Sequence, residues 1–249
     1  MLLLLNGTSD SRDLAAILQK NGYEIIAVAS GAHDVSSLNK LGIENISINL
    51  NEKSIIDSCR KFKASAIIDA SHPYAEYTHS LAMDSAISLG IECLRFERPF
   101  SDIKGNNIKF ANNYIEAVKY AEKGNNILIT TGIKNIENYQ KLIHEKNVFV
   151  RTLPVADNIE LLINMDIKRE NIIAMEGIFN EALESAILEN YKIDTIVTKD
   201  SGFHSLPKIN AAIKKGISLI IIKRPPVINA NMSYTADGII KILRKHNIK

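Results

Sequence analysis

Several loops of this sequence combine small, hydroxyl-bearing and charged residues in the manner of ligand sites. Each one follows a short apolar run rich in Leu, Ile or Val. Ligands of parallel α/β sheets bind beyond the carboxyl ends of the strands, so loops in this position are the first candidates for chemistry. The main ones read Asn6-Gly7-Thr8-Ser9-Asp10-Ser11-Arg12, Asp69-Ala70-Ser71-His72-Pro73-Tyr74-Ala75, Thr130-Thr131-Gly132, Met175-Glu176-Gly177-Ile178-Phe179 and Thr198-Lys199-Asp200-Ser201-Gly202.

The loop at residues 6–12 has two interpretations. Gly7 allows close backbone approach, and Thr8 and Ser9 bring hydroxyls to a helix N-terminus, which favours phosphate binding. The G-x-G-x-x-G fingerprint is absent, however. The same residues suit a helix cap, with Asp10 favourable in the first turn. On this segment alone, cap and phosphate cradle are equally open.

The segment Ser30-Gly31, after the second apolar run, lacks the Asp or Glu that holds the adenosine ribose in NAD-binding folds. An acid at this place would repel the 2′-phosphate of NADP. Its absence favours NADP over NAD, and a plain glycine turn explains the same residues equally well.

The loops at residues 69–75 and 198–202 are chemically the densest. The first brings an acid, a hydroxyl, an imidazole and a phenol to a helix opened by Pro73. Its place at a strand end favours ligand binding, with a cap by Ser71 or His72 as the alternative. In the second loop a Lys, an Asp and a Ser beside a Gly can bind a carboxylate or phosphate, or relay a proton. A Lys–Asp pair that shapes the turn is the alternative there.

Other classes of protein lack their sequence patterns here. The H-E-x-x-H, C-x-x-C, G-x-x-x-x-G-K-[ST] and G-x-S-x-G motifs are absent. Cys59 and Cys93 have no metal-ligand spacing and the six histidines are scattered, so we expect no metal bound by the protein. The net charge is +2 and basic residues are spread along the chain, which argues against a nucleic-acid partner.

The elements that position these loops follow from hydrophobic periodicity. Apolar residues at consecutive positions are typical of parallel strands that helices cover on both faces. We predict strands at Leu2–Leu5, Ile25–Ala29, Ile46–Ile48, Ala66–Asp69, Cys93–Phe96, Ile127–Thr130, Val148–Val150, Ile172–Ala174, Thr195–Thr198 and Leu219–Ile222. We predict helices at Asp10–Lys20, Tyr74–Leu89, Tyr114–Glu122, Glu181–Asn190, Pro207–Lys215 and Ala236–Lys245.

The alternation of these elements predicts an α/β fold of two Rossmann-like, doubly wound domains with mostly parallel sheets and helices on both faces. The polar stretch Lys123-Gly124-Asn125-Asn126 marks the boundary between them. The predicted domains are residues 1–123 and 124–249, and a single continuous sheet is the alternative.

Membrane association is not expected. No apolar run approaches the roughly 20 residues that cross a bilayer. The opening Met1–Leu5 lacks the basic region and the length of a signal peptide. We therefore expect a cytoplasmic protein.

Six short motifs, in order and spacing over nearly the whole chain, resemble those of the precorrin-6A and cobalt-precorrin-6A reductase family. They read N-G-T-S-D-S-R at residue 6, D-A-S-H-P-Y-A at 69, R-F-E-R-P at 95, T-T-G at 130, V-T-K-D-S-G at 197 and K-R-P-P at 223. The sequence departs from the commoner pattern at Asn6, Ile178 and Phe203, where Gly, Pro and Gly are frequent. These departures affect the shape of the three loops.

The resemblance implies an NADPH-dependent oxidoreductase of cobalamin biosynthesis, which reduces a ring double bond of precorrin-6A or cobalt-precorrin-6A to the 6B form. It further implies that residues 1–123 bind NADPH and that the tetrapyrrole lies in a cleft between the domains. The cofactor-binding residues that it implies are Gly7, Thr8, Ser9, Arg12, Ser30, Gly31, Thr131 and Gly132.

A precorrin carries many carboxylates, which Arg and Lys side chains bind through charge-assisted hydrogen bonds. The substrate-binding candidates are Ser71, Tyr74, Arg95, Arg98, Arg151, Lys199, Asp200, Ser201, Gly202 and Lys208. A proton must also reach the carbon beside the one that accepts hydride. His72 and Lys199 are the candidate donors, with an ordered water as the third, and the sequence gives no choice among them.

Two other functions stay open at this point. The chain could be a non-catalytic nucleotide- or tetrapyrrole-binding protein, since one fold serves many functions. It could also be another NAD(P)-dependent reductase, although the Y-x-x-x-K pair of short-chain reductases is not evident. As to assembly, we expect a monomer or a weak homodimer.

Overall fold

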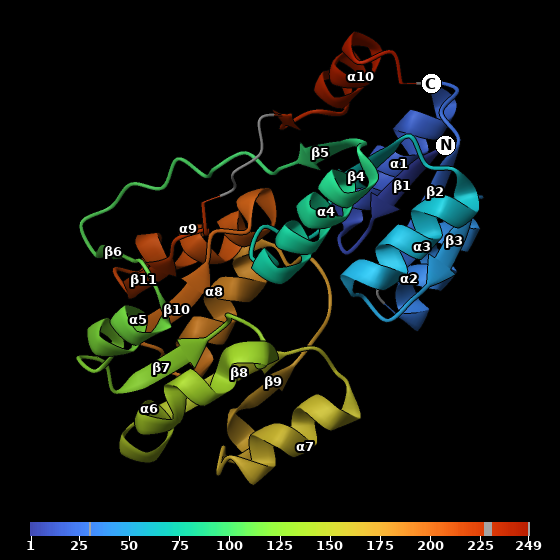
Figure 1. The fold of residues 1–249 in the computed structure, drawn as a ribbon. Coiled ribbons are helices and arrows are strands. Elements are labelled where there is room, and N and C mark those ends of the chain that lie inside the picture. The colour runs from blue at the N-terminus through green and yellow to red at the C-terminus, as the bar shows by residue number, and fades with distance from the viewer. Residues whose placement is uncertain (30, 227–230, 249) are drawn as a thin grey trace. The chain divides into compact units, whose positions relative to one another are not determined.

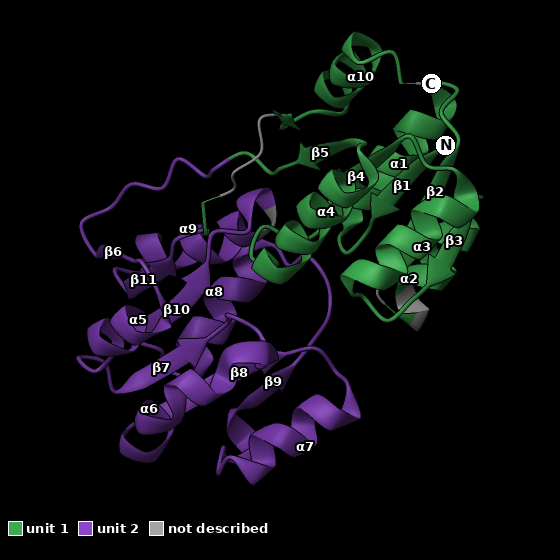
Figure 2. Ribbon diagram, viewed as in Figure 1, with its two compact units in different colours: residues 1–99, 225–249 green, residues 100–224 purple. Residues whose placement is uncertain are grey.

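A computed structural model describes residues 1–29, 31–226 and 231–248 of the chain (Figure 1). The chain forms two compact units (Figure 2). Unit 1 contains residues 1–99 and 225–249, and unit 2 contains residues 100–224.

Unit 1 is built on a six-stranded, all-parallel sheet in the order β12-β5-β4-β1-β2-β3. Its strands are β1 (Leu2–Leu5), β2 (Ile25–Ala29), β3 (Asn45–Ser47), β4 (Ala66–Asp69), β5 (Glu92–Phe96) and β12 (Met232–Ser233). Its helices are α1 (Ser9–Lys20), α2 (Ala32–Lys40), α3 (Glu52–Phe62), α4 (Glu76–Leu89) and α10 (Ala236–Lys245).

Strand β1 shows why the apolar runs contain apolar residues at every position rather than at every second one. Leu2 and Leu4 pack into a core with α1 and α10, and Leu3 and Leu5 pack into a second core with α3 and α4. Successive side chains of a strand point to opposite faces, so a strand covered on both faces must be apolar at every position. The four leucines of β1 are each at most 1% exposed.

Unit 2 repeats the arrangement with a second six-stranded parallel sheet in the order β6-β11-β10-β7-β8-β9. Its strands are β6 (Ile108–Ala111), β7 (Asn126–Ile129), β8 (Asn147–Thr152), β9 (Ile172–Ala174), β10 (Thr195–Lys199) and β11 (Ser218–Ile222). Its α-helices are α5 (Tyr114–Ala121), α6 (Gln140–Glu145), α7 (Ala156–Asn164), α8 (Glu181–Asn190) and α9 (Leu206–Lys214). Short 3-10 helices lie at η1 (Ile133–Tyr139), η2 (Arg169–Asn171) and η3 (Gly202–Ser205).

The predicted fold class is confirmed, because both sheets are parallel and carry helices. Each of the ten predicted strands is present within one or two residues of its predicted bounds. The helix predicted from Tyr74 begins at Glu76 instead, because residues 70–75 form a loop and turn.

The observed division of the chain differs from the predicted boundary at residues 123 and 124. The strand β6 pairs with β11, so residues 100–123 belong to unit 2. The strand β12 pairs with β5, and α10 packs Ile239 and Leu243 into the core of unit 1. The chain therefore passes between the units twice, and its last segment returns to the first unit.

Within the three described ranges, no helix is both long and apolar enough to cross a membrane.

The helix α10 offers a test of local packing. Replacing Gly238 by Ala normally strengthens a helix, but a Cβ here would lie 1.9 Å from Oγ and 2.9 Å from Cβ of Ser233. We expect Gly238→Ala to lower the free energy of unfolding by about 1–3 kcal/mol, the usual cost of overpacking. Urea denaturation measures this, and the double variant with Ser233→Gly should recover most of the loss. A gain in stability in the single variant would contradict this packing.

Candidate active site

The loop after β1 caps helix α1. Oγ1 of Thr8 accepts a hydrogen bond from the amide of Ser11 at 3.2 Å, and the amide of Thr8 donates to Oγ of Ser11 at 3.0 Å. The amide of Gly7 donates to the same Ser11 oxygen at 3.2 Å, and Ser11 in turn donates to the Asn6 side chain. The cap interpretation is confirmed. The phosphate-cradle interpretation stays a prediction, because Ser11 holds the amides of Gly7 and Thr8 that a phosphate would use.

One side-chain donor of this loop has no hydrogen-bond partner among the described residues. The side-chain amide nitrogen of Asn6 is buried and forms no hydrogen bond with the part of the chain that the structure describes. A buried donor without a partner costs about 1–3 kcal/mol, and such groups recur where a ligand or water completes a site.

The loop after β4 lies directly beside the loop after β1. A Cβ added to Gly7 would lie 3.9 Å from Cα of Ser71 and 4.0 Å from the amide nitrogen of His72. The loops of neighbouring strands β1 and β4 therefore meet at the carboxyl edge of the sheet, as predicted for residues 6–12 and 69–75.

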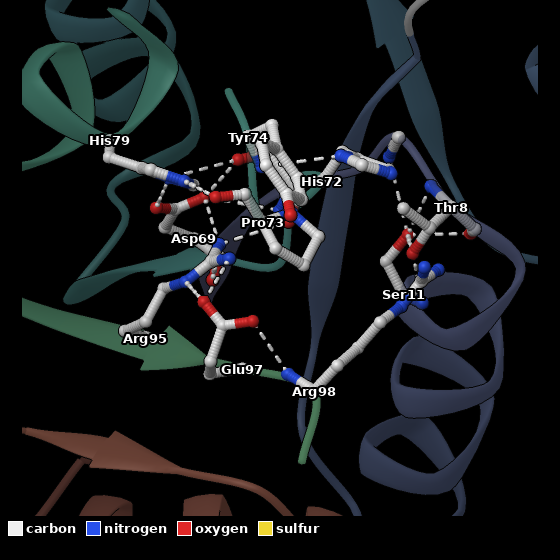
Figure 3. A network of polar contacts seen from close by, with 12 residues as sticks. Thr8, Ser11, Asp69, His72, Pro73, Tyr74, His79, Arg95, Glu97 and Arg98 are labelled. Carbon is white, nitrogen blue, oxygen red and sulfur yellow. Dashed lines mark hydrogen bonds and ion pairs between the residues drawn. The ribbon is translucent and has the colours of Figure 1, made fainter. Parts of the chain in front are cut away.

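Asp69, the last residue of β4, is buried at the centre of a polar network (Figure 3). Its carboxylate accepts from Oγ of Ser71 at 2.6 Å and from the ring Nδ1 of His79 at 2.7 Å, and it lies 3.0 Å from Nη1 of Arg95. Burial alone would raise the pKa of Asp69. The hydrogen bond from His79 and the charge of Arg95 outweigh burial and hold the pKa of Asp69 below its usual value.

Arg95 lies beside Asp69 in the register of β4 and β5 and is 1% exposed. Its Nε and Nη2 atoms donate to Glu97 at 3.1 and 2.8 Å. Its Nη1 atom donates to the carbonyl oxygens of Asp69 and Ser71 at 3.2 and 3.0 Å. All three guanidinium nitrogens are engaged inside the protein, so Arg95 supports this loop, and the structure gives no support to the prediction that it binds substrate.

The polar network around Asp69 supports the loop that carries His72, the candidate proton donor of unit 1. His72 and Tyr74 lie on the same turn, with their ring centroids 5.7 Å apart, and Nδ1 of His72 accepts from the amide of Tyr74 at 3.3 Å. Both side chains are half-buried, whereas Ser71 is buried. The buried charged network thus lies beside the turn that carries these two half-buried rings (Figure 3).

Removing the imidazole of His79 should weaken this support. His79→Ala leaves one oxygen of the buried Asp69 carboxylate without its partner, and we expect the free energy of unfolding to fall by about 1–3 kcal/mol. His79→Gln keeps a hydrogen-bond donor and should lose less. Urea denaturation of the two variants compares them, and equal stability of His79→Ala and the parent would contradict a role for this bond.

The other predicted residues of unit 1 lie around the same edge. Nη1 of Arg12 lies 2.7 Å from Asp34, and Nε of Arg98 lies 2.6 Å from Asp10. Ser9 is half-buried in the first turn of α1, and Gly31 is exposed with open space where a Cβ would stand. Ser30 lies outside the described residues.

Unit 2 has its own hollow, of about 310 Å³, at the carboxyl edge of its sheet. Its polar lining residues are Thr130, Arg151, Thr152, Asn158, Glu184 and Lys208, and glycines and apolar residues complete the wall. Arg151 comes from the end of β8, Glu184 from α8 and Lys208 from α9. Gly132, Arg151 and Lys208 were predicted as site residues from the sequence, whereas Glu184 was not.

Two further groups of predicted residues surround this edge. Thr131 is buried, and its hydroxyl lies 3.1 Å from that of Tyr139. Nζ of Lys199 lies 5.7 Å from the ring centroid of Tyr114. Burial, assisted by the charge of Lys134, lowers the pKa of Lys199 to about 8. A lysine ammonium with this pKa can give up a proton near neutral pH.

Asp200 serves mainly to shape its loop. Its Oδ1 atom accepts from the amide of Gly202 at 3.0 Å and from Oγ of Ser101 at 2.8 Å, and its carbonyl oxygen accepts from Nε of Arg224 at 2.7 Å. Ser101 and Arg224 lie close to the two points where the chain enters and leaves unit 2. Asp200 therefore shapes this turn, and its role as a substrate contact stays a prediction. Ser201 is half-buried and Gly202 is buried beside it.

A larger hollow of about 640 Å³ lies at the opposite, amino edge of the unit 2 sheet. Its wall includes Asn126, Asn147 and Asn171, whose side chains form a ladder of 2.8 Å hydrogen bonds from the starts of β7 and β8 to the end of η2. None of the predicted loops ends there. We therefore place the candidate site at the carboxyl edges of the sheets, because the predicted functional residues lie there, although the hollow at the amino edge is larger.

Three acidic or basic partners escaped prediction: His79, Glu97 and Glu184. His79 and Glu184 lie on helices, and ten or more residues of chain separate His79 from Asp69 and Glu184 from Arg151. Glu97 was detectable within R-F-E-R-P, where it stands two residues from Arg95, directly after the end of β5. For His79 and Glu184 the signal in the sequence was weak. Each is an ionisable residue on a helix that comes later in the chain than a strand with a residue of opposite charge at or near its end.

Comparison with known proteins gives one consistent result. The family model described as precorrin-6x reductase matches residues 1–244. A cobalt-precorrin-6A reductase of Priestia megaterium is 31% identical, over 98% of this chain and 98% of its own length. One from Methanococcus maripaludis is 31% identical over 89% and 90%. The solved structure of a precorrin-6A reductase superposes with a TM-score of 0.83 at 20% identity, over 100% of this chain and 98% of its own, which shows a shared fold.

Proposed function

The chain belongs to the precorrin-6x reductase family, and from this premise we propose that it reduces a ring double bond of precorrin-6A or cobalt-precorrin-6A, with NADPH as the hydride donor. The reaction is a step of cobalamin biosynthesis that yields the 6B form. The observation that carries the proposal is the family match over residues 1–244, which spans every loop of both carboxyl edges.

Features of unit 1 fit a dinucleotide of the NADP type. The orphaned side-chain nitrogen of Asn6 is a donor at the start of α1 that a bound group can satisfy. The backbone at Gly31 faces open space, and no acid follows β2 directly. Asp34, the first acid of α2, is buried and already paired with Arg12. An unpaired acid that would repel a 2′-phosphate is therefore not found at this place among the described residues.

The remaining assignments follow the family resemblance. We propose that Gly7, Thr8, Ser9, Arg12, Ser30, Gly31, Thr131 and Gly132 hold the cofactor. Reduced nicotinamide, when bound, supplies the hydride, and the protein contributes mainly orientation and the exclusion of water. Ser71, Tyr74, Arg98, Arg151, Lys199, Asp200, Ser201, Gly202 and Lys208 are the proposed substrate contacts. A cytoplasmic location and a monomer or weak homodimer complete the proposal.

The test is incubation of the protein with NADPH and precorrin-6A, or its cobalt form. Nicotinamide absorbance should fall while the visible spectrum of the ring changes, with one NADPH oxidised for each macrocycle reduced. NADH in place of NADPH should support a slower reaction. Absence of NADPH oxidation with both forms of the substrate would refute the proposed activity.

The proton donor can be identified separately. We expect single-turnover NADPH oxidation to slow by about 100-fold in whichever of His72→Ala and Lys199→Ala removes the donor, since a positioned acid contributes at least that much. Lys199, with its pKa near 8, should also show a rate that falls as pH rises through this value. Unchanged rates in both variants would exclude both side chains and leave water as the donor.

A further inference from the structure

Lys208 is a cation in an unusual position. It lies in the first turn of α9 and is 9% exposed. Its ammonium forms no hydrogen bond or ion pair with the described part of the chain, and it lines the 310 Å³ hollow of unit 2. Lysines are almost never this buried unless they are paired.

The neighbouring charges do not supply the missing partner. Nη1 of Arg151 lies 2.9 Å from both carboxylate oxygens of Glu184, and both side chains are largely buried. Glu184 thus neutralises Arg151, while Nε and Nη2 of Arg151 form no hydrogen bond with the described residues. The hollow contains two cations and one carboxylate when Lys208 is protonated, and it keeps unused donors on both cations.

The rest of the wall limits what can enter. Thr130 and Thr152 add hydroxyls, Gly132 and Gly177 leave the backbone accessible, and Leu153, Met175 and Phe179 are apolar. A volume of about 310 Å³ lies at the lower end of the range for ligand pockets. It suits one acidic side chain with a piece of its parent ring rather than a whole dinucleotide or a whole macrocycle.

We propose that Arg151, Glu184 and Lys208 form a receptor for a single oxyanion, and that its occupant is one carboxylate side chain of the tetrapyrrole substrate. This assignment rests on the proposed function and makes it specific. Arg151 gives a planar pair of donors, Lys208 gives the charge that the anion neutralises, and Glu184 sets the direction of the guanidinium. A phosphate group of the cofactor has the same chemistry, and the experiments below separate the two sources.

The pKa of Lys208 also supports an anion at this position. Burial first, and then the charge of Arg151, lower the pKa of Lys208 to about 7, against the opposing effect of Glu184. Arg151 and Glu184 are the charged groups that act on this ammonium. An anion beside Lys208 raises its pKa again, so binding near pH 7.5 should take up a fraction of a proton. Calorimetry in two buffers of different ionisation enthalpy measures that uptake.

The central variant is Lys208→Met, which keeps the length of the side chain and removes its charge. Its KM for the macrocycle should rise about 10- to 100-fold, the effect of losing one charged hydrogen bond, while its KM for NADPH stays within twofold of the parent. Proton uptake should disappear. The melting temperature should not fall, because a buried unpaired ammonium has been removed. Lys214→Met, on the exposed side of the same helix, is the matched control and should match the parent in each measurement.

Glu184→Gln should change the affinity for the macrocycle in the opposite direction from Lys208→Met. The amide oxygen can still accept from Arg151, but the hollow loses the one carboxylate that its described lining residues provide, so the affinity for the macrocycle should increase severalfold at low salt. A merely structural pair would give weaker binding or no change, and either result would overturn the receptor.

Binding of the octacarboxylate porphyrin uroporphyrin, followed by fluorescence, separates this inference from the proposed activity. Weaker porphyrin binding in Lys208→Met supports the receptor even if the parent does not oxidise NADPH. A parent that turns over, with a Lys208→Met variant that is normal for both ligands, overturns the receptor and leaves the activity standing. A variant weakened for NADPH alone assigns the hollow to a cofactor phosphate and overturns the carboxylate assignment.

Discussion

Replacing Arg95 by Met is expected to lower the free energy of unfolding by about 3–5 kcal/mol, a large share of the stability of a protein of this size. The change leaves the buried carboxylates of Asp69 and Glu97 without the guanidinium that lies between them. Asp69 keeps His79 and Ser71, and Glu97 keeps a hydrogen bond from the amide of Arg98. The main source of the loss is that two buried carboxylates lose the same cation.

Urea denaturation of Arg95→Met measures the effect. Arg60→Met, which removes an exposed arginine from α3 of the same unit, is the control and should change stability by less than about 0.5 kcal/mol. The double variant Arg95→Met with Glu97→Met also removes one of the two acids that lose the guanidinium and should recover part of the loss. A single Arg95→Met variant as stable as the Arg60 control would contradict the network.

Lys208→Met is expected to change the pH dependence of stability more than any other lysine substitution. Lys208 has a pKa of about 7 in the folded protein and about 10.5 when unfolded. If folding lowers the pKa of a lysine, the unfolded chain binds the proton more tightly than the folded protein does. The folded state is therefore less stable at every pH at which the unfolded lysine is protonated. That cost is absent above about pH 10.5, grows as the pH falls to about 7 and is constant below that pH. At 1.36 kcal/mol per pKa unit, it is on the order of 5 kcal/mol at neutral pH.

The variant should therefore be more stable than the parent at pH 6–7, and the two stability curves should converge toward pH 10. The measurement is the free energy of unfolding of both proteins at half-unit intervals of pH, without added anions. Lys214→Met, which removes an exposed lysine of α9, should give a curve parallel to that of the parent. Parallel curves for Lys208→Met and the parent would mean that Lys208 has an ordinary pKa.

Much of this fold could be predicted because parallel strands covered on both faces leave a plain signal. Runs such as Leu2–Leu5 have no polar residue, since both faces pack against helices. The strand β6 escaped prediction because it lies at the sheet edge, where Ile108, Lys109 and Phe110 are all partly exposed and mixed in polarity. The strand β12 has two residues, too few for any periodicity. Helix α3 contains only Ile55 and Cys59 as buried apolar residues, a pattern too sparse to predict.

The loops of the candidate site could be predicted from the sequence, but the ion pairs within the site could not. Topology alone places residues 6–12 and 69–75 together, because they follow adjacent strands. The sequence could not assign Arg95 to the interior and Arg151 to a hollow, since both are arginines at strand ends. What separates them is their partners, and Glu184 lies 33 residues beyond Arg151. Charges so far apart along the chain meet only through the packing of a helix on a sheet.

The exchange of segments between the two sheets has a consequence for biogenesis. As the polypeptide emerges from the ribosome, residues 100–224 are contiguous and can complete their sheet as soon as β11 appears. Unit 1 must wait longer, because its β12 and α10 come from residues 225–249. Until those residues have been synthesised, the leucine-rich face that α10 covers has no helix to bury it and can bind chaperones. The unit whose synthesis begins first is thus the last to complete its fold.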